Sequence, residues 1–358
     1  MTQAARPFGR WAVPRHPPRV HGGVDAAGPL PHDFSSNANA AGPLPSVAAA
    51  VRRADRTRYP DPQYHALRQV LAGWHRVAFE RVLPVASGSA FIQQFTRAAA
   101  AWAGVRRVVL PVPGYGDYAA AARAEGLAAC AYRRLAQAPP PQPGELWWIT
   151  EPASPEGTTA APLLGGWLHA AHAAGAIVVL DLAYEPLRLD RAAPGPVRTD
   201  ATAWQLWSPN KACGLTGVRG AYAIAPPGAE DTAQALLRDA ASWPLGADGV
   251  ALLQAFGTPK AQAELAASRE VLRAWRAGLA SLLRGRGWAA GDADSVVPFF
   301  CARPAVPPDA AALRAHGVRL RDAASMGLPG AWRLSAQPPA AQRALADALA
   351  PADMEALR

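Results

Sequence analysis

Short apolar runs alternate with segments of helical spacing over the first two thirds of the chain. Runs of strand length lie at residues 107–112, 146–150, 176–180, 204–207 and 221–225. Helical spacing covers residues 45–58, 64–79, 118–126 and 164–174. Because apolar strands that alternate with helices are typical of a sheet covered on both faces, this pattern predicts an α/β fold with a mostly parallel sheet.

The spacing changes near residue 244. Residues 261–284 are predicted to form a long helix whose apolar face carries Leu265, Leu272, Trp275, Leu279 and Leu282. A segment around residue 333 and a helix over residues 339–349 complete this part. The sequence therefore predicts an N-terminal arm (residues 1–35), a large α/β/α domain (36–243) and a smaller α+β domain (244–358).

Composition bounds the class of protein. The chain has 358 residues, of which 50% are hydrophobic, so it can bury a large core. No apolar run reaches the roughly 18 residues that cross a bilayer, and the N-terminal segment lacks an apolar signal core. We therefore expect a cytoplasmic protein without a membrane partner. Cys130, Cys213 and Cys301 lack metal-ligand spacing, so reduced thiols and no metal site are expected.

The formal net charge of +9 is consistent with a protein that binds nucleic acid, because a basic field attracts phosphates. The arginines are dispersed along the chain, however, and no basic run is interleaved with stacking aromatic residues. We therefore expect affinity for small anions and no nucleic-acid partner.

Lys211 is one of only two lysines in a chain whose Lys and Arg residues number 36. It lies among small residues directly after an apolar run, whereas Lys260 lies at the polar start of a predicted helix. Lysine can form a Schiff base once its pKa is lowered, and arginine cannot. Lys211 is therefore the first candidate for covalent chemistry.

Polar and aromatic residues follow the predicted strands. Taken singly, Tyr115 is explained as a turn aromatic, Asp181 as a helix cap and Ser208 as a turn former. Ligands of open α/β sheets bind beyond the carboxyl ends of the strands, however, and these ends would meet at one rim. The candidate residues on this rim are Tyr115, Ser154, Asp181, Tyr184, Ser208 and Lys211.

A phosphate cradle is predicted at Ser87-Gly88-Ser89-Ala90, which enters a helix whose free N–H groups suit a phosphate. Gly114 and Gly116 lack the third glycine of a dinucleotide site. An amine for a Schiff base, an acid for a pyridinium nitrogen, an aromatic ring for stacking and a phosphate cradle together indicate a pyridoxal phosphate site.

With these residues the chain resembles the class I/II pyridoxal-phosphate-dependent aminotransferases of the aspartate aminotransferase fold, over nearly its whole length. Residues 208–219 match their Ser-x-x-Lys-Ala-x-Gly-Leu-x-Gly-x-Arg block, which is highly specific, and residues 58–62 resemble their Tyr-Pro segment. The pattern is most similar to histidinol-phosphate aminotransferase and to the threonine-phosphate decarboxylase of cobalamin biosynthesis. The resemblance implies the pyridoxal-phosphate-dependent transferase fold (fold type I) and a homodimer.

The resemblance also implies a role for each candidate residue. Lys211 would form the Schiff base, Asp181 would pair with the pyridine nitrogen, and Tyr184 would hydrogen-bond the ring hydroxyl. Tyr115 would stack on the ring, and Arg333 would bind the substrate α-carboxylate, with a structural ion pair as the alternative. The cofactor phosphate would be held by Gly88, Ser89, Ala90, Ser208 and Arg219, with Tyr59 reaching in from a second subunit.

Some positions depart from the family pattern or point to one branch of it. Ser154 stands where the family usually has an asparagine on the ring hydroxyl, and the shorter serine would reach the ring through water.

His21-Gly22-Gly23 and residues 33–39 resemble segments that line the decarboxylase's phosphate pocket. His21 and Asn39 are therefore predicted to contact substrate, although His21 is equally well explained as an exposed arm residue.

The reaction itself stays open at this stage, because the bond held perpendicular to the cofactor ring is the one that breaks. We interpret the chain as a pyridoxal-phosphate-dependent aminotransferase acting on an amino acid, phosphorylated or not. Threonine-phosphate decarboxylase is the alternative. A noncatalytic pyridoxal-phosphate-binding regulator is a third hypothesis, disfavoured because the sequence shows no appended helix-turn-helix module.

Overall fold

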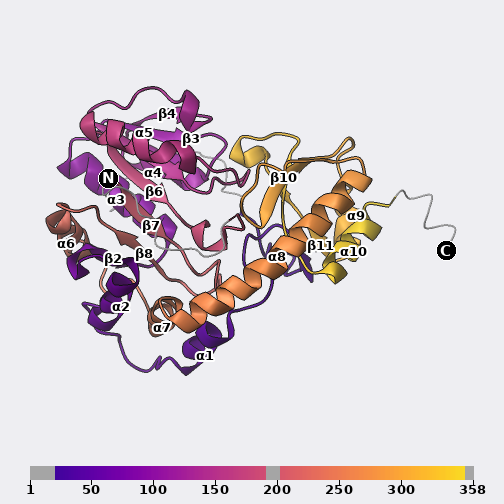
Figure 1. Cartoon of the computed structure of the whole chain (residues 1–358), viewed down its shortest axis with the longest axis horizontal. Helices are drawn as coiled ribbons and strands as arrows, with labels where there is room; N and C mark the ends of the chain where they lie inside the picture. The colour runs from indigo at the N-terminus through magenta and orange to yellow at the C-terminus, as the bar shows by residue number, and fades with distance from the viewer. Residues whose placement is uncertain (1–20, 191–201, 351–358) are drawn as a thin grey trace, which may run out of the picture.

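The computed structural model describes residues 21–190 and 202–350, which form a larger and a smaller part joined by a long helix (Figure 1). The α-helices are α1 (Pro45–Arg53), α2 (His65–His75), α3 (Gly88–Trp102), α4 (Gly116–Ala124), α5 (Ala161–Ala173), α6 (Glu230–Arg238), α7 (Ala247–Phe256), α8 (Pro259–Gly285), α9 (Ala310–Ala315) and α10 (Pro339–Ala348). The strands are β1 (His32–Asp33), β2 (Val82–Val85), β3 (Arg107–Pro111), β4 (Ala128–Tyr132), β5 (Glu145–Thr150), β6 (Ile177–Asp181), β7 (Trp204–Trp207), β8 (Ala221–Ile224), β9 (Ala289–Ala290), β10 (Phe299–Arg303), β11 (Val318–Arg319), β12 (Arg321–Asp322) and β13 (Trp332–Ser335). Short 3-10 turns lie at Phe79–Arg81, Leu135–Gln137, Glu185–Leu187 and Ala324–Met326.

A seven-stranded sheet in the order β2-β8-β7-β6-β5-β3-β4 forms the centre of the larger part. Strands β3 to β7 pair in parallel, whereas β8 pairs antiparallel with both β2 and β7. Trp147 and Trp148, neighbours on β5, are both fully buried on opposite faces. The Trp147 face packs against α1, α2, α5, α7 and α8, and the Trp148 face against α3, α4 and α6. The predicted α/β fold with a mostly parallel, doubly covered sheet is confirmed.

The five predicted strands are confirmed within one or two residues, but two further strands of the central sheet were not predicted. Strand β4 lies at one edge of the sheet, is mostly exposed and contains three alanines, which have low β-propensity. Strand β2 lies at the other edge and contains Pro84, which a sheet tolerates only at an edge or a bulge. Strand β4 therefore lacked the burial of the central strands, whereas β2 is buried and apolar but is short and interrupted by a proline.

The first predicted helix, over residues 45–58, was wrong at its end, because α1 stops at Arg53. Asp55 Oδ1 accepts hydrogen bonds from Thr57 N at 2.9 Å and Thr57 Oγ1 at 2.6 Å. Such a local turn competes with the helical hydrogen bonds. The second predicted helix is likewise shorter, since α2 ends at His75.

The smaller part consists of a sheet in the order β12-β13-β10-β9 together with α9, α10 and the second half of α8 (Figure 1). Of the face predicted for α8, Leu265, Leu272 and Leu279 are fully buried. Leu282 is only partly buried, and Leu283 is buried in its place. The buried face shifts because Leu272 packs into the core of the larger part and Leu279 into that of the smaller part.

Residues 21–44 run from the smaller part to the larger part. Strand β1 pairs in parallel with β11, and Phe34 is fully buried in the core of the smaller part. The chain then reaches α1, where Ser46 Oγ donates to Glu264 of α8 at 2.7 Å. Residues 1–20 of the predicted arm lie outside the described residues, and the domain boundaries stay predictions.

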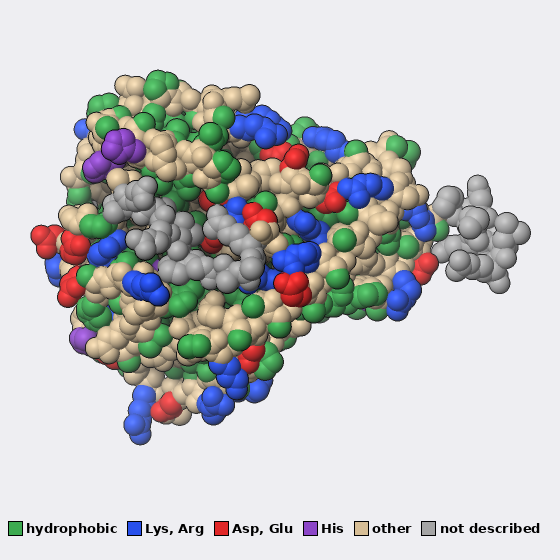
Figure 2. Space-filling view, in the orientation of Figure 1, with side chains coloured by type: hydrophobic (Ala, Val, Ile, Leu, Met, Phe, Trp, Pro, Cys, Tyr) green, Lys and Arg blue, Asp and Glu red, His purple; other side chains and the backbone are tan. Residues whose placement is uncertain are grey.

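Charged side chains of both signs are scattered over the face of the molecule in Figure 2, without one continuous basic stripe. None of the helices in the described ranges is both long enough and apolar enough to span a membrane. The same ranges contain no group of three or more His, Cys, Asp or Glu side chains arranged to hold a metal ion.

Candidate active site

The loop after β7 carries Lys211 beyond the carboxyl end of a central strand. A backbone hydrogen bond of 2.9 Å from Leu215 N to Asn210 O closes the loop into a turn. Lys211 is half-buried, and its Nζ lies 5.4 Å from the centre of the Tyr184 ring. The turn thus directs the amine toward the residues that follow β6.

Asp181 is the buried last residue of β6. Its Oδ2 accepts a hydrogen bond of 2.6 Å from Tyr118 Oη, and its Oδ1 accepts one of 3.0 Å from Ala183 N. Tyr118 Oη also lies 2.9 Å from Thr150 Oγ1, at the end of β5. Burial raises the pKa of Asp181, whereas the Tyr118 hydrogen bond and the charge of Lys211 oppose that rise. Asp181 is therefore a buried acid whose ionised form has dedicated support.

Tyr184 connects the Lys211 loop to the smaller part. Its hydroxyl accepts a hydrogen bond of 3.3 Å from Asn37 Nδ2, and the buried Oδ1 of Asn37 has no partner among the described residues. Its ring meets Phe299 of β10 edge-on at 4.7 Å. The Arg333 guanidinium lies 5.8 Å from the centre of the Phe299 ring. The amine and this arginine thus belong to one contiguous set of contacts.

Arg333 and a second arginine share one face of the smaller sheet. Arg333 is buried and donates to Ser35 O at 2.7 Å, while its Nε has no partner within the described residues. Arg321 lies directly opposite on β12, so the two side chains project from the same face. Burial and the charge of Arg333 lower the pKa of Arg321. Cys301, the other cross-strand neighbour of Arg333, donates to Pro155 O at 3.4 Å, which directs this face toward the loop after β5.

The predicted phosphate cradle lies at the start of α3. Ser87 Oγ accepts a hydrogen bond of 3.1 Å from Ala90 N, so the Ala90 N–H is already used inside the chain. A Cβ atom on Gly88 would lie 2.9 Å from Ser208 Oγ. Glycine therefore lets the Lys211 loop approach the first turn of α3.

Tyr115 joins this cradle to the acid. Its hydroxyl lies 2.9 Å from Ser89 Oγ, and its ring meets Tyr118 edge-on at 5.9 Å. The His21 ring centre lies 6.5 Å from that of Tyr115. Burial raises the pKa of Tyr115, so its hydroxyl stays protonated. The candidate residues from α3, α4, β6 and β7 are thus brought together.

Asn39 is placed differently from its predicted contact with substrate. Its Nδ2 donates to Ala212 O at 3.0 Å and to Ser268 Oγ at 2.9 Å, and its own N–H donates to Lys211 O at 2.9 Å. Its side-chain oxygen accepts from the backbone two residues later. All of its polar groups are therefore used inside the chain, which favours support of the Lys211 loop. Asn37 is the asparagine that reaches Tyr184.

Three predicted residues are not joined to this set. Tyr59 is 78% exposed and stacks on Trp243 with ring centres 4.4 Å apart. Arg219 is exposed and donates to Thr216 O at 2.8 Å. Ser154 is half-buried, and the structure gives its side chain no hydrogen bond to another described residue.

Sequence reasoning did not assign roles to Tyr118, Asn37 or Arg321. Tyr118 lies one helical turn after Tyr115, a spacing that brings both to one side of α4 once the helix is recognised. Asn37 lies in the segment that was matched to the family, two residues before the asparagine that was chosen. Arg321 had no local signal, because its pairing with Arg333 depends on the tertiary strand register.

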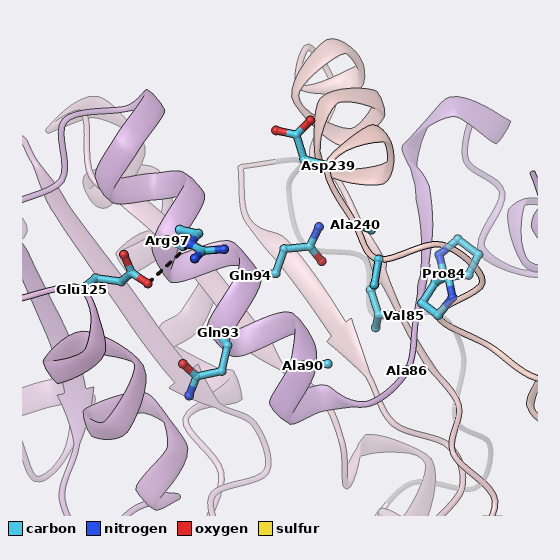
Figure 3. A pocket seen from close by; sticks show the side chains of 12 residues that line it. Pro84, Val85, Ala86, Ala90, Gln93, Gln94, Arg97, Glu125, Asp239 and Ala240 are labelled. Atoms are coloured by element: carbon cyan, nitrogen blue, oxygen red, sulfur yellow. Dashed lines mark ion pairs between the residues drawn. The ribbon is translucent and has the colours of Figure 1, made fainter. Parts of the chain in front are cut away.

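A hollow of about 460 Å³ lies beside this site and not at its centre. Figure 3 shows its lining from Ala90, Gln94 and Arg97 of α3 on one side and Asp239 after α6 on the other, with Arg97 paired to Glu125. Its lining contains none of the residues around the amine. The hollow therefore meets the site only at the first turn of α3.

Comparisons with known proteins identify the family of the chain. The model of the aminotransferase class I and II family matches residues 32–349. No curated protein sequence matches the chain significantly.

Solved structures of similar fold cover nearly the whole chain at low identity. L-threonine-O-3-phosphate decarboxylase from Porphyromonas gingivalis aligns with a TM-score of 0.73 at 18% identity, over 91% of this chain and 99% of that chain. Histidinol-phosphate aminotransferase from Sinorhizobium meliloti, in complex with pyridoxal-5'-phosphate, aligns with a TM-score of 0.71 at 21% identity, over 93% of each chain. Aspartate aminotransferase from Thermus thermophilus aligns with a TM-score of 0.72 at 21% identity, over 88% of this chain and 89% of that chain. The fold is therefore fold type I, and the chain belongs to the class I and II aminotransferases, a family of pyridoxal-phosphate-dependent enzymes.

Proposed function

We propose that this chain is a pyridoxal-phosphate-dependent aminotransferase whose amino-acid substrate carries a phosphate as its second anionic group. The observation that carries the proposal is the pair of buried arginines, Arg321 and Arg333, joined through Phe299 and Tyr184 to the Lys211 amine. Each of the two neighbouring arginines can bind one anionic group, so the pair favours a substrate that carries two such groups.

The residues present fit pyridoxal phosphate. The first N–H groups of α3 have no helical acceptor and suit a phosphate, and Gly88 leaves room there beside Ser208. Asp181 keeps acceptor capacity after its two hydrogen bonds, because a carboxylate has about four acceptor positions. The unpartnered Oδ1 of Asn37 is a buried polar atom that a ligand would satisfy.

Each residue around the cofactor then has a distinct task. When bound, pyridoxal phosphate supplies a ring that withdraws electrons from the substrate Cα. Lys211 Nζ would hold the cofactor's aldehyde carbon and would later move the proton at the substrate Cα. Asp181 would hold the proton on the pyridine nitrogen, Tyr184 would donate to the ring hydroxyl oxygen, and Tyr115 would orient the ring by stacking.

The arginines determine how the substrate lies. The planar fork of Arg333 binds the α-carboxylate with two parallel hydrogen bonds, and its unused Nε supplies one donor. Arg321 binds the phosphate from the same sheet face. This orientation would leave the Cα–H bond perpendicular to the cofactor ring and therefore as the bond that breaks. One structure of similar fold is named for L-threonine-O-3-phosphate, which carries both an α-carboxylate and a phosphate, and this supports the substrate class.

A phosphothreonine decarboxylase is the second candidate, and one observation favours it. The His21-Gly22-Gly23 segment packs against the site, with Gly23 N bonded to Ser35 Oγ at 2.8 Å and the His21 ring 6.5 Å from Tyr115. A histidine held there would add a donor for phosphate and could turn the carboxylate, instead of Cα–H, perpendicular to the ring.

The deciding experiment gives the holoenzyme a panel of amino acids, histidinol phosphate, threonine and threonine phosphate, and measures pyridoxamine phosphate and carbon dioxide. We expect pyridoxamine phosphate that a keto acid converts back. Stoichiometric carbon dioxide release from threonine phosphate would replace the aminotransferase by the decarboxylase. Bound cofactor without turnover of any compound would favour the noncatalytic binder.

We expect Arg321→Leu to raise KM for the phosphorylated substrate about 10- to 100-fold, because a hydrogen-bonded charge contributes roughly 1.5–3 kcal/mol. Turnover of the unphosphorylated analogue should change little. Arg303→Leu is the control, since Arg303 is exposed on β10 of the same sheet and bonds only Pro329 O among described residues. An equal loss for both substrates would contradict a phosphate-binding role of Arg321.

We also propose a homodimer in which Tyr59 reaches the cofactor phosphate of the second subunit. Its support is the exposed stack of Tyr59 on Trp243, the latter 42% exposed. Analytical ultracentrifugation should give the mass of two chains. Tyr59→Phe should leave that mass unchanged and weaken cofactor retention by about tenfold, the value of one charge-assisted hydrogen bond. A fully active single chain would contradict the proposal.

A further inference from the structure

Tyr118 is a fully buried tyrosine at the start of α4 that neither cofactor nor substrate binding has used so far. Its Oη lies 2.6 Å from Asp181 Oδ2 and 2.9 Å from Thr150 Oγ1. A carboxylate can only accept, so the phenol proton points to Asp181 and Thr150 donates to the phenol oxygen. Three side chains from β5, α4 and β6 thus form one directed chain that ends on the carboxylate.

The surroundings hold this phenol in a single orientation. Its ring stacks on fully buried Trp148, with centres 5.1 Å apart and planes 14° apart, and meets Tyr115 edge-on. Thr150 and Asp181 are directly paired neighbours in the sheet, so the two partners of the hydroxyl are also at a fixed separation. The donor therefore cannot leave Asp181 without disturbing the core.

The electrostatics of the pair point in the same direction. Burial raises the pKa of Asp181, and the hydrogen bond from Tyr118 is the largest of the influences that oppose this rise. Burial and the nearby carboxylate raise the pKa of Tyr118 well above its usual value, so the phenol remains a donor. A neutral Asp181 could not balance a protonated ring nitrogen.

We propose that Tyr118 is a positioning residue that keeps the Asp181 carboxylate ionised and aimed at the pyridine nitrogen of the cofactor. This inference rests on the proposed function, since it needs Asp181 to face that nitrogen. Through Asp181, Tyr118 would set how far the ring withdraws electrons, without touching cofactor or substrate itself.

The test reconstitutes wild type and Tyr118→Phe with pyridoxal phosphate labelled with ¹⁵N in the ring and records the ¹⁵N chemical shift at pH 7. Wild type should show a protonated nitrogen. In Tyr118→Phe the less stabilised carboxylate takes up more of the proton, so the shift should move toward that of an unprotonated pyridine. Cofactor affinity should fall about tenfold, as expected for a lost hydrogen bond to a charged group.

Tyr132→Phe is the matched control, because Tyr132 is also buried and bonds only the backbone, Trp148 O, at 3.0 Å. It should leave the ¹⁵N shift unchanged. If Tyr118 had a purely structural role, the ¹⁵N shifts of Tyr118→Phe and Tyr132→Phe would be the same. Asp181→Asn separates the two proposals. If the ¹⁵N shift differs from wild type in Asp181→Asn but not in Tyr118→Phe, the role of Tyr118 alone is overturned. An unprotonated nitrogen in wild type, unaffected by Asp181→Asn, would overturn the assignment of Asp181.

A second substitution decides the matter if Tyr118→Phe does not fold. A ring-fluorinated tyrosine at position 118 keeps the shape of the side chain and makes the phenol a stronger acid, hence a stronger donor. The ¹⁵N shift should then stay at the wild-type value or move further toward full protonation. A move toward the unprotonated pyridine would overturn the proposal.

Discussion

Lys211→Ala is expected to abolish covalent attachment of pyridoxal phosphate and to reduce turnover by at least about 10³-fold. In the proposed function the amine would have two tasks, since it would bond the cofactor in the resting enzyme and move the substrate proton, and proton transfer by a positioned group alone contributes roughly 10²–10⁴-fold. Borohydride reduction followed by peptide mass spectrometry measures the attachment. Wild type should carry the reduced cofactor on the peptide that contains Lys211.

The chain offers a matched control, because Lys260 is its only other lysine. Lys260→Ala should keep both the attachment and the turnover of wild type. Lys211→Arg keeps a positive charge that cannot condense with an aldehyde, so it should behave like Lys211→Ala. Reduced cofactor still linked to Lys211→Ala would show that Lys211 is not the bonding residue.

Asp181→Asn is expected to lower kcat by about 10²–10³-fold, comparable to the loss of one preorganised electrostatic partner in other active sites. The amide is close in shape and can still accept from Tyr118, but it carries no charge to hold a proton on the ring nitrogen. Cofactor attachment to Lys211 should persist, because that bond does not require Asp181. Steady-state kinetics and borohydride reduction on the same preparation separate the two effects.

Asp181→Glu serves as the companion to this substitution. It restores the charge with a longer side chain, so it should recover part of the activity if charge is what matters. Equal losses of kcat in Asp181→Asn and Asp181→Glu would show that the shape of the side chain matters and not its charge. An active Asp181→Asn would contradict the pairing of Asp181 with the ring nitrogen.

The sequence predicted correctly those elements whose burial appears as a run or a regular repeat of apolar residues. Strands buried on both faces, such as β5 and β6, have unbroken apolar centres at residues 146–149 and 177–180, and leucines recur along the buried face of α8. Edge strands β2 and β4 were missed because a proline interrupts the first and the second is mostly exposed, so that their strand pairing depends on the neighbours they meet in the folded chain. The end of α1 was missed for a different reason, since a local turn at Asp55 competes with the helical hydrogen bonds.

The candidate site likewise contains residues that the sequence identified and residues whose contacts it could not predict. Lys211, Asp181, Tyr184 and Tyr115 were identified from the sequence because each follows a strand, and strand ends of a parallel sheet meet at one rim. Asn39 was assigned to substrate, whereas its polar groups are taken up by Ala212, Ser268 and the backbone. A local motif could not predict these hydrogen bonds of Asn39, because its partners Ala212 and Ser268 lie more than 170 residues away in the sequence.

The sequence by itself determined the family and the doubly covered sheet and singled out the candidate lysine, because these follow from local periodicity and from a contiguous block of residues. Only the tertiary structure decided which donors support that chemistry. Tyr118 and Thr150 on Asp181, Asn37 on Tyr184, and Arg321 beside Arg333 all come from different elements. Their roles depend on distances and strand register, and these exist only once distant segments have packed together.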